Sequence, residues 1–153
     1  MSFLRRHKPL RRYTPLRRKT PLRKVSARQK TILELDMLAK AVVIERDGKR
    51  CLRCGATDNL HSSHIFPKGK YPKLRFNIDN LKILCFDCHI GWWHQHPEEA
   101  GDWIQTAIPK ERYDRLLKWV IYVDHSILDL KLIEEELQQL LKYYKQYGKT
   151  EGN

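Results

Sequence analysis

The sequence lacks a long apolar run. No stretch approaches the ~20 consecutive apolar residues that a membrane-spanning helix needs. Prolines and arginines also interrupt the apolar segment that a secretory signal would require near the first residue. An arginine-rich start is typical of mitochondrial transit peptides too, but the prolines at 9, 15 and 21 would break the amphipathic helix of such a peptide. We therefore expect a cytoplasmic protein in a reducing compartment, with no membrane partner.

Acidic residues are missing from the first 30 positions, which hold twelve lysines and arginines. The remaining residues carry equal numbers of each sign, so the net charge of +12 belongs to this segment. Its Pro-Leu-Arg repeat favours an extended chain that does not fold alone. We expect residues 1–26 to be a flexible basic arm that releases counterions from DNA, with a solubilising tail as the alternative. The candidate phosphate contacts of this arm are Arg11, Arg12, Arg17 and Arg18.

Cysteine is scarce, and none is left over from two Cys-x-x-Cys pairs. The pairs are Cys51 with Cys54 and Cys85 with Cys88. Two such knuckles can bind one tetrahedral Zn²⁺ in a closed, structural site. Disulfides are the alternative, but nothing marks the chain as secreted. A redox role lacks the thioredoxin-like βαβ setting. The spacing therefore predicts structural zinc.

The order of residues around the two knuckles resembles the HNH nuclease motif. His64-Ile follows the first knuckle, Asn80-Leu precedes the second, and His89 comes directly after the last cysteine. In that family a zinc-clipped hairpin and a following helix form a ββα-metal site that cuts phosphodiester bonds. The resemblance implies three catalytic residues: His64 as the general base, Asn80, which fixes the loop and orients His64 or else binds the ion, and His89. It also implies a catalytic Mg²⁺ or Mn²⁺, with other divalent ions as alternatives.

The ligands of that catalytic ion are less well defined by the sequence. Many HNH proteins have a His or Asp ligand directly before the base, but this chain has Ser63, whose hydroxyl is a poor ligand. His61 lies on the same face of the predicted strand as Ser63, and we take it as the replacement. The other predicted ligands, His89 and His94, are five residues apart, so both can bind only if the helix is irregular there.

The loop between the predicted strands is rich in cations. Pro67, Gly69 and Pro72 lie among its lysines and arginine, so we expect no regular structure there. A solvated surface loop is the plain alternative, but next to a phosphodiester site we expect phosphate contacts, above all from Arg75, whose planar fork can grip a phosphate twice. The candidates are Arg75, Lys68, Lys70 and Lys73.

Apolar periodicity predicts helices on both sides of this module. One runs from Ser26 to about Arg46, and others over 97–107, from Pro109, and from a cap at Asp124 or Ser126 to Gly148. The strands are expected at 61–66 and 81–85. The apolar face of the last helix can cover the nuclease module or pair with a second subunit as a homodimer. The fold class is α+β, with a basic arm (1–26), an HNH module (27–108) and a C-terminal helical region (109–148).

The predicted function is a metal-dependent HNH endonuclease that hydrolyses DNA. The wider setting resembles phage recombination nucleases of the NinG or Rap kind, which implies recombination or DNA processing, with branched or junction DNA as a substrate and the host cytoplasm as the location if the chain is phage-encoded. The alternative is a non-catalytic zinc-finger protein that binds nucleic acid. That alternative explains the cysteines and the arm, but not the order of His64, Asn80 and His89.

Overall fold

The structure is a computed structural model that describes residues 24–121 and 128–148. Most of the predicted basic arm lies outside the described residues, and so do Asp124 and Ser126. The elements follow in the order α1 (Ala27–Asp47), β1 (Leu60–His64), η1 (Pro72–Leu74), η2 (Ile78–Asn80), β2 (Leu81–Cys85), η3 (Asp87–Trp93), α2 (Pro97–Ala107), α3 (Lys110–Ile121) and α4 (Leu130–Tyr147). Helices and a small two-stranded sheet confirm the predicted α+β class.

Helix α1 begins and ends where its sequence predicts. Ser26 and Gln29 form a capping box, in which the Ser26 hydroxyl accepts a bond from the Gln29 N–H and the Gln29 side chain accepts one from the Ser26 N–H. Gly48 ends the helix with φ +85°, a conformation that side chains rarely adopt. The buried residues of α1 are Leu35, Ala39, Val42 and Val43.

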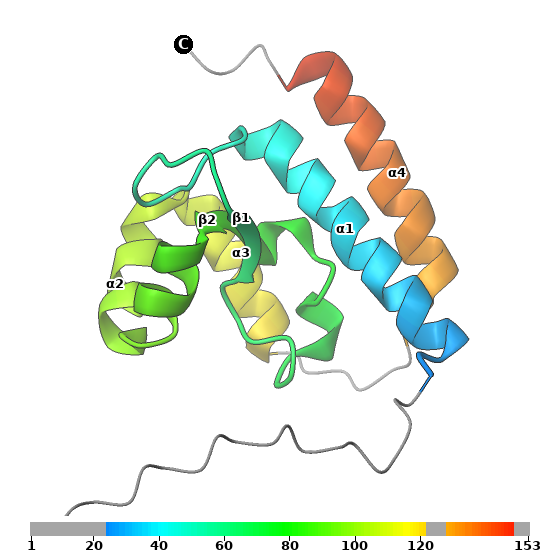
Figure 1. The fold of residues 1–153 in the computed structure, drawn as a ribbon, viewed down its shortest axis with the longest axis horizontal. Helices are drawn as coiled ribbons and strands as arrows, with labels where there is room; N and C mark the ends of the chain where they lie inside the picture. Colours follow the sequence, from blue (N-terminus) through cyan, green and yellow to red (C-terminus); the bar gives the residue numbers. More distant parts are fainter. Residues whose placement is uncertain (1–23, 122–127, 149–153) are drawn as a thin grey trace, which may run out of the picture.

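The two strands pair antiparallel at the centre of the molecule (Figure 1). Leu60 pairs with Cys85, and His64 pairs with Leu81. Strand β2 is buried along its whole length, with Leu81 and Ile83 in the core next to α1. The alternate residue Lys82 lies against Trp93 of η3, so the two faces of β2 are covered by different elements.

Strand β1 is shorter than predicted and stops at His64 instead of continuing to Phe66. The reason is Asn80, whose backbone carbonyl accepts the Ile65 N–H at 2.8 Å and whose side-chain oxygen accepts the Phe66 N–H at 2.7 Å. These two bonds to one residue take the place of further strand pairing beyond His64 and Leu81.

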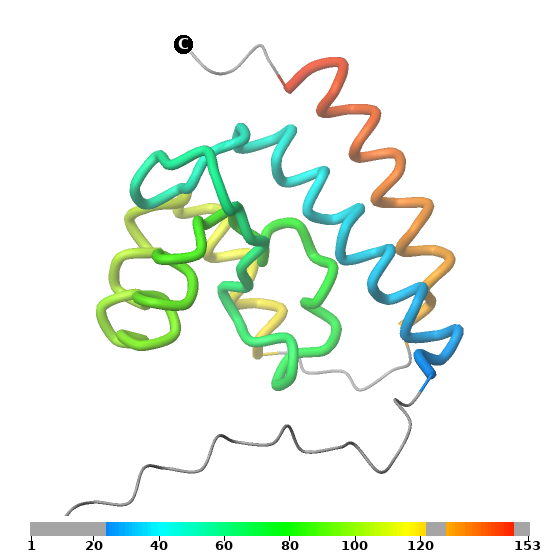
Figure 2. Tube along the Cα trace, in the orientation of Figure 1, coloured from blue at the N-terminus to red at the C-terminus, as the bar shows by residue number. Residues whose placement is uncertain are grey.

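Helix α4 packs alongside α1, and the two run side by side along one flank (Figures 1 and 2). Leu137 is buried in the core that includes α1 and β2. Most of the apolar stripe of α4 packs against that core: Leu130, Ile133, Leu140, Leu141 and Tyr144. The stripe therefore covers the module of its own chain, and the homodimer predicted through this face has no support in the structure.

The start of α4 differs from the prediction. The helix begins at Leu130, where the Asp129 carboxylate accepts bonds from the backbone N–H groups of Lys131 (3.0 Å) and Leu132 (3.2 Å). The predicted caps at Asp124 and Ser126 are therefore wrong, because the nearer carboxylate at Asp129 has the capping geometry. At the other end, Gly148 follows the last turn as predicted. None of the described helices is long and apolar enough to cross a membrane.

Candidate active site and zinc centre

The four cysteines come together although 31 positions separate the inner pair in the sequence. One sulfur atom from each lies within 4.8 Å of the others, and the Cys54 and Cys85 sulfurs are 3.6 Å apart. That distance is too long for a disulfide and close to the ~3.8 Å edge of a tetrahedron with ~2.3 Å Zn–S bonds. Gly55 has φ +77°, which allows the tight turn after the first knuckle. The donor set and its dimensions fit Zn²⁺.

The thiols have unequal acidities. Burial pushes the pKa of Cys51 up, but backbone N–H groups of Cys54, Cys85 and Arg53 outweigh it and bring the pKa down to about 7. Burial and then the neighbouring Cys85 thiol raise the pKa of Cys88 to about 12. Four thiols this close together cannot all lose their protons unless a cation is bound among the sulfur atoms. The Arg53 guanidinium, 3.9 Å from the Cys88 sulfur, offsets part of the resulting negative charge.

His64 is held at its ring by a backbone carbonyl. Its Nε2 lies 3.0 Å from the carbonyl oxygen of Arg75. A carbonyl only accepts, so Nε2 carries the proton in this contact and Nδ1 is left unprotonated. Burial lowers the pKa of His64, and the Arg75 carbonyl partly opposes this effect. The ring is therefore neutral at pH 7, with a nitrogen able to accept a proton.

Asn80 fixes the loop that supplies this carbonyl. Its side chain is fully buried and makes three bonds to backbone: it accepts the Phe66 N–H at 2.7 Å and donates to the carbonyls of Phe66 (3.0 Å) and Leu74 (2.9 Å). Leu74 directly precedes Arg75, so the clamp joins both ends of the loop that follows His64. From the sequence, Asn80 could either fix this loop or bind the ion. In the structure its side chain bonds to the loop backbone.

Two arginines that the sequence analysis did not single out hold the turn carrying Asn80. Arg46 of α1 donates to the carbonyls of Ile78 (2.8 Å) and Leu81 (3.1 Å). Arg112 of α3, itself buried, donates to the Asp79 carbonyl at 2.9 Å and to Leu81. Burial, and next the charge of Arg46, lower the pKa of Arg112 to about 10, which still leaves it a cation at pH 7. Guanidinium–carbonyl contacts have no sequence period, so no pattern could have predicted them.

His89 and His94 face each other because η3 is a π-helix. Its backbone N–H at His94 donates to the His89 carbonyl at 3.3 Å, an i to i+5 bond. The wider turn brings residues five apart onto one face, and the two Nε2 atoms lie 3.1 Å apart. The five-residue spacing of His89 and His94 predicted an irregular helix, and η3 is one.

His61 approaches His89 from the opposite side of its ring. The two Nδ1 atoms are 3.2 Å apart, so His89 faces His94 through Nε2 and His61 through Nδ1. With the rings in these positions the three histidines do not converge on one point. Within the described residues only the cysteines bring three or more ligand atoms together.

The pair His89 and His94 nevertheless fits a divalent ion. Two ligands at right angles around an ion at ~2.1 Å lie ~3.0 Å apart, close to the observed 3.1 Å. Burial, then the neighbouring His94 and His61, lower the pKa of His89 to about 4. An imidazole that is neutral at pH 7 has the lone pair that a metal needs. Two nitrogen ligands suit Mn²⁺ or a later metal better than Mg²⁺.

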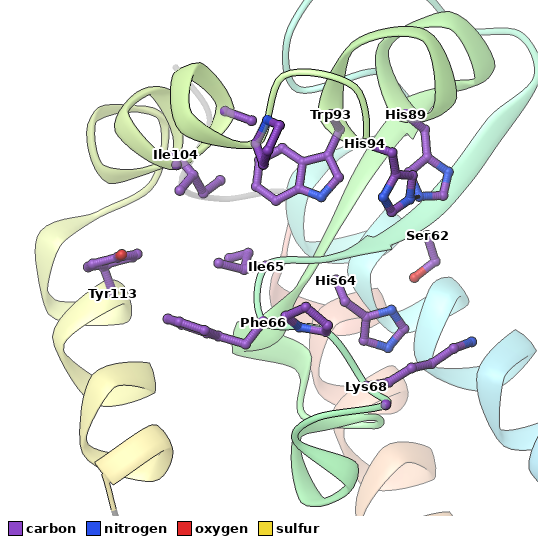
Figure 3. Close-up of a pocket in the computed structure, with 15 residues that line it drawn as sticks. Ser62, His64, Ile65, Phe66, Lys68, His89, Trp93, His94, Ile104 and Tyr113 are labelled. Carbon is purple, nitrogen blue, oxygen red and sulfur yellow. Dashed lines mark hydrogen bonds between the residues drawn. The ribbon is translucent and has the colours of Figure 1, made fainter.

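A single cleft of about 570 Å³ is lined by His64 of β1, by His89 of η3 and by His94, the residue directly after η3 (Figure 3). His64, His89 and His94 lie toward one side of the view with Ser62 and Lys68, while Phe66, Ile104 and Tyr113 lie toward the other. His61 is not among the lining residues and lies edge-on to Phe86 and His89.

Ser63 is not among the residues that line this cleft. It is 1% exposed, pairs with Lys82 across the sheet, and accepts a bond from the Lys82 ammonium at 3.4 Å. Lys82 also donates to the His64 carbonyl (3.3 Å) and lies 3.1 Å from the centre of the Trp93 ring. Burial, then the charge of Arg112, depress the pKa of Lys82 well below its usual range. Lys82 had no predicted role, although it joins the strand of His64 to η3, the helix of His89.

The predicted phosphate-binding residues are spread over different surroundings. Lys68 is exposed and lines the cleft, and Lys70 lies over the Tyr71 ring. Lys73 lines a separate groove beside α4. Arg75 forms a two-pronged ion pair with Asp36 of α1, with N–O distances of 2.6 and 3.1 Å. Its part in phosphate binding remains a prediction and would require competition with that carboxylate. Arg11, Arg12, Arg17 and Arg18 lie outside the described residues.

A four-cysteine centre that fits zinc, a pair of strands and a following helix that presents histidines to a cleft are the features of the ββα-metal class. Comparison with protein families agrees: residues 51–91 match the model of the HNH endonuclease family. The chain therefore contains an HNH endonuclease domain over these residues. His94 and helices α1–α4 lie outside the matched segment. Comparisons with curated proteins and with solved structures give no match, so the likeness to phage recombination nucleases is not shown.

Proposed function

We propose that this protein is a metal-dependent endonuclease that hydrolyses DNA phosphodiester bonds. The observation that carries the proposal is that His64, His89 and His94, from two separate elements, line one cleft beside the four-cysteine centre. A structural zinc finger needs the cysteines but does not need three histidines around a solvent-accessible cleft.

In the proposed reaction His64 removes a proton from the attacking water. The Arg75 carbonyl leaves Nδ1 of His64 as the accepting nitrogen, and burial keeps the ring neutral at pH 7. Asn80 acts as a positioning residue, because its three bonds hold the loop to which that carbonyl belongs.

His89 and His94 would hold the catalytic ion. When bound, a divalent ion neutralises charge on the phosphate and on the leaving oxygen. We assign His61 a supporting role instead of the ligand role that its spacing suggested. Metal-bound histidines usually engage a second group through their other nitrogen, and His61 contacts His89 at that nitrogen. The four-cysteine centre takes no part in the chemistry and replaces part of a core that so small a module lacks.

The substrate is DNA, as the HNH domain implies. Recombination or DNA processing on branched DNA is the finer form of the proposal. The basic segment at residues 1–30 supplies positive charge for the phosphate backbone.

The test compares cleavage of plasmid and of synthetic branched DNA by the wild type and by His64→Ala, with EDTA, Mg²⁺ and Mn²⁺. We expect metal-dependent cutting that falls at least ~100-fold in His64→Ala, because a positioned general base contributes about that much or more. His96→Ala is the matched control, since His96 is exposed and does not line the cleft. Zinc content and DNA binding must be unchanged in both variants.

The alternative function, a zinc-finger protein that binds nucleic acid without cutting it, makes the opposite prediction. A wild-type protein that binds DNA with a full complement of zinc, yet cuts no substrate with any divalent ion, would establish the alternative. Faster cutting of the branched substrate than of the plasmid would support the recombination role.

A further inference from the structure

The cleft beside His64 has two halves of different chemistry. Its polar half is formed by Ser62, His64, Lys68, His89 and His94. The other half is apolar and is lined by Ile65, Phe66, Trp93, Ile104 and Tyr113 (Figure 3). No carboxylate is present among the described residues that line the cleft. The reaction proposed above does not use the apolar half.

The aromatic walls of this apolar half are held from behind. The backbone of Phe66 is bonded at both its N–H and its carbonyl by Asn80, and its ring packs edge-on against Tyr71. Trp93 has the Lys82 ammonium against one face and Trp103 at its edge. Because these aromatic side chains are already fixed, they lose little conformational entropy when a ligand binds. A ligand that makes only a few contacts with them can therefore still bind.

Tyr113 of α3 completes the enclosure. Its ring centre lies 6.2 Å from that of Phe66, and the ring planes are tilted by 32°. Arg112, the preceding residue, bonds to the Asp79 and Leu81 carbonyls and so anchors this turn of α3 to the sheet. Tyr113 and Phe66 are each half-buried, so their rings offer flat surfaces to the cleft.

The position of this half relative to His64 indicates what it binds. Phe66 is two residues after His64, so the two backbones are at most ~7 Å apart. A group attached to the phosphate at His64 would therefore reach the aromatic walls. In DNA the flat aromatic group nearest to each phosphate is a nucleobase, and bases stack on aromatic side chains when they are not paired.

We propose that the apolar half of the cleft, between Phe66, Tyr113 and Trp93, binds an unpaired nucleobase next to the phosphate that is cut. This inference rests on the proposed function for the position of the cut. A base inside a duplex is paired and stacked, so the cleft favours DNA that is single-stranded at the cleavage site. All four bases have a flat face, and the apolar walls offer few groups that read base edges, so stacking here gives weak sequence preference.

The first test measures binding and needs no cleavage. Single-stranded oligonucleotides that contain 2-aminopurine, and fully paired duplexes of the same sequence, are titrated with the zinc-loaded full chain in Ca²⁺. Fluorescence anisotropy gives the affinity, and quenching of 2-aminopurine reports stacking. We expect quenching on the single strand, and about tenfold weaker single-strand binding by Tyr113→Leu with duplex affinity unchanged, the size of one lost stacking contact.

Three further variants keep the test falsifiable. Tyr113→Phe retains the ring and should bind single strands as tightly as the wild type does. Phe66→Leu should lower the affinity for single strands as much as Tyr113→Leu does. Tyr143→Leu is the matched control, because Tyr143 is 56% exposed on α4 and far from the lining residues in sequence. Zinc content and thermal melting confirm that each variant is folded.

The outcomes separate this inference from the proposed function. Quenching that Tyr113→Leu and Phe66→Leu abolish, in a protein that never cuts DNA, supports the base pocket and refutes the nuclease. Cutting that is equal on single and double strands and unaffected by Tyr113→Leu supports the nuclease and refutes the base pocket. Equal loss of single-strand and duplex affinity in Tyr113→Leu also refutes it, since that result indicates general backbone binding.

Discussion

Asn80→Ala is the most informative single substitution in this domain. The wild-type side chain is fully buried and makes three bonds to the backbone of Phe66 and Leu74. Each bond contributes about 1 kcal/mol net, so we expect the free energy of unfolding to fall by roughly 3 kcal/mol, and by more where a backbone group is left buried and unpaired. Released from this clamp, the Arg75 carbonyl no longer fixes His64, and cleavage should fall at least ~100-fold.

Asn80→Asp sharpens the same experiment. A carboxylate can still accept the Phe66 N–H, but it cannot donate to the Phe66 and Leu74 carbonyls and repels them. We therefore expect Asn80→Asp to be destabilised as well, even though its shape is nearly unchanged. A residue that acted by binding the ion would instead tolerate the carboxylate, because oxygen ligands of that kind suit Mg²⁺ and Mn²⁺.

The assay is urea unfolding at fixed zinc concentration, followed by circular dichroism, with cleavage rates measured on the same preparations. Gln138→Ala is the control: it removes one exposed bond to Glu134 on α4 and does not touch the turn that carries Asn80. If Asn80→Ala lost cleavage with less than ~1 kcal/mol of destabilisation, the positioning role would be refuted, since three buried bonds cannot vanish at so small a cost.

Two further predictions concern the metal centre and the base. Cys88→Ser should lose most of its zinc and unfold at room temperature, because zinc binding supplies folding energy in small modules; zinc analysis and melting curves would measure this, and full stability without zinc would contradict it. Burial lowers the pKa of His64, so its neutral, proton-accepting form is present above that lowered pKa. We therefore expect kcat/KM in Mn²⁺ to rise through an inflection below pH ~6.5 and to be flat from pH 7 to 8. An inflection above pH 7 would exclude His64 as the base.

Several parts of the fold could be predicted because they are encoded locally. The caps at Ser26 and Gly48 set the bounds of α1, Pro97 opens α2 as expected, and the two knuckles are defined by cysteine spacing alone. In each case the residue type and the backbone conformation it stabilises are neighbours in the chain, so the pattern is readable in sequence.

The remainder depends on contacts between distant segments. Arg46 and Arg112 hold the turn of Asn80 from different helices, and Lys82 in the strand sequence LKILC is buried against Trp93 instead of facing water. The end of β1 is set by Asn80, fourteen residues after Phe66. The five-residue spacing of His89 and His94 did carry a signal, because it is incompatible with one face of an α-helix, and the π-helix is the physical answer to it.

The pairing of α1 with α4 has a consequence for synthesis of the protein. A ribosome that has completed residue 121 has made every candidate site residue and both zinc knuckles, but it has not made the helix that packs along α1. Until Leu137 emerges, the apolar flank of α1 around Leu35, Val42 and Val43 lacks part of its cover. The chain without α4 therefore exposes apolar surface and is prone to unfolding, and we expect the module to reach its final stability only after α4 has left the ribosome.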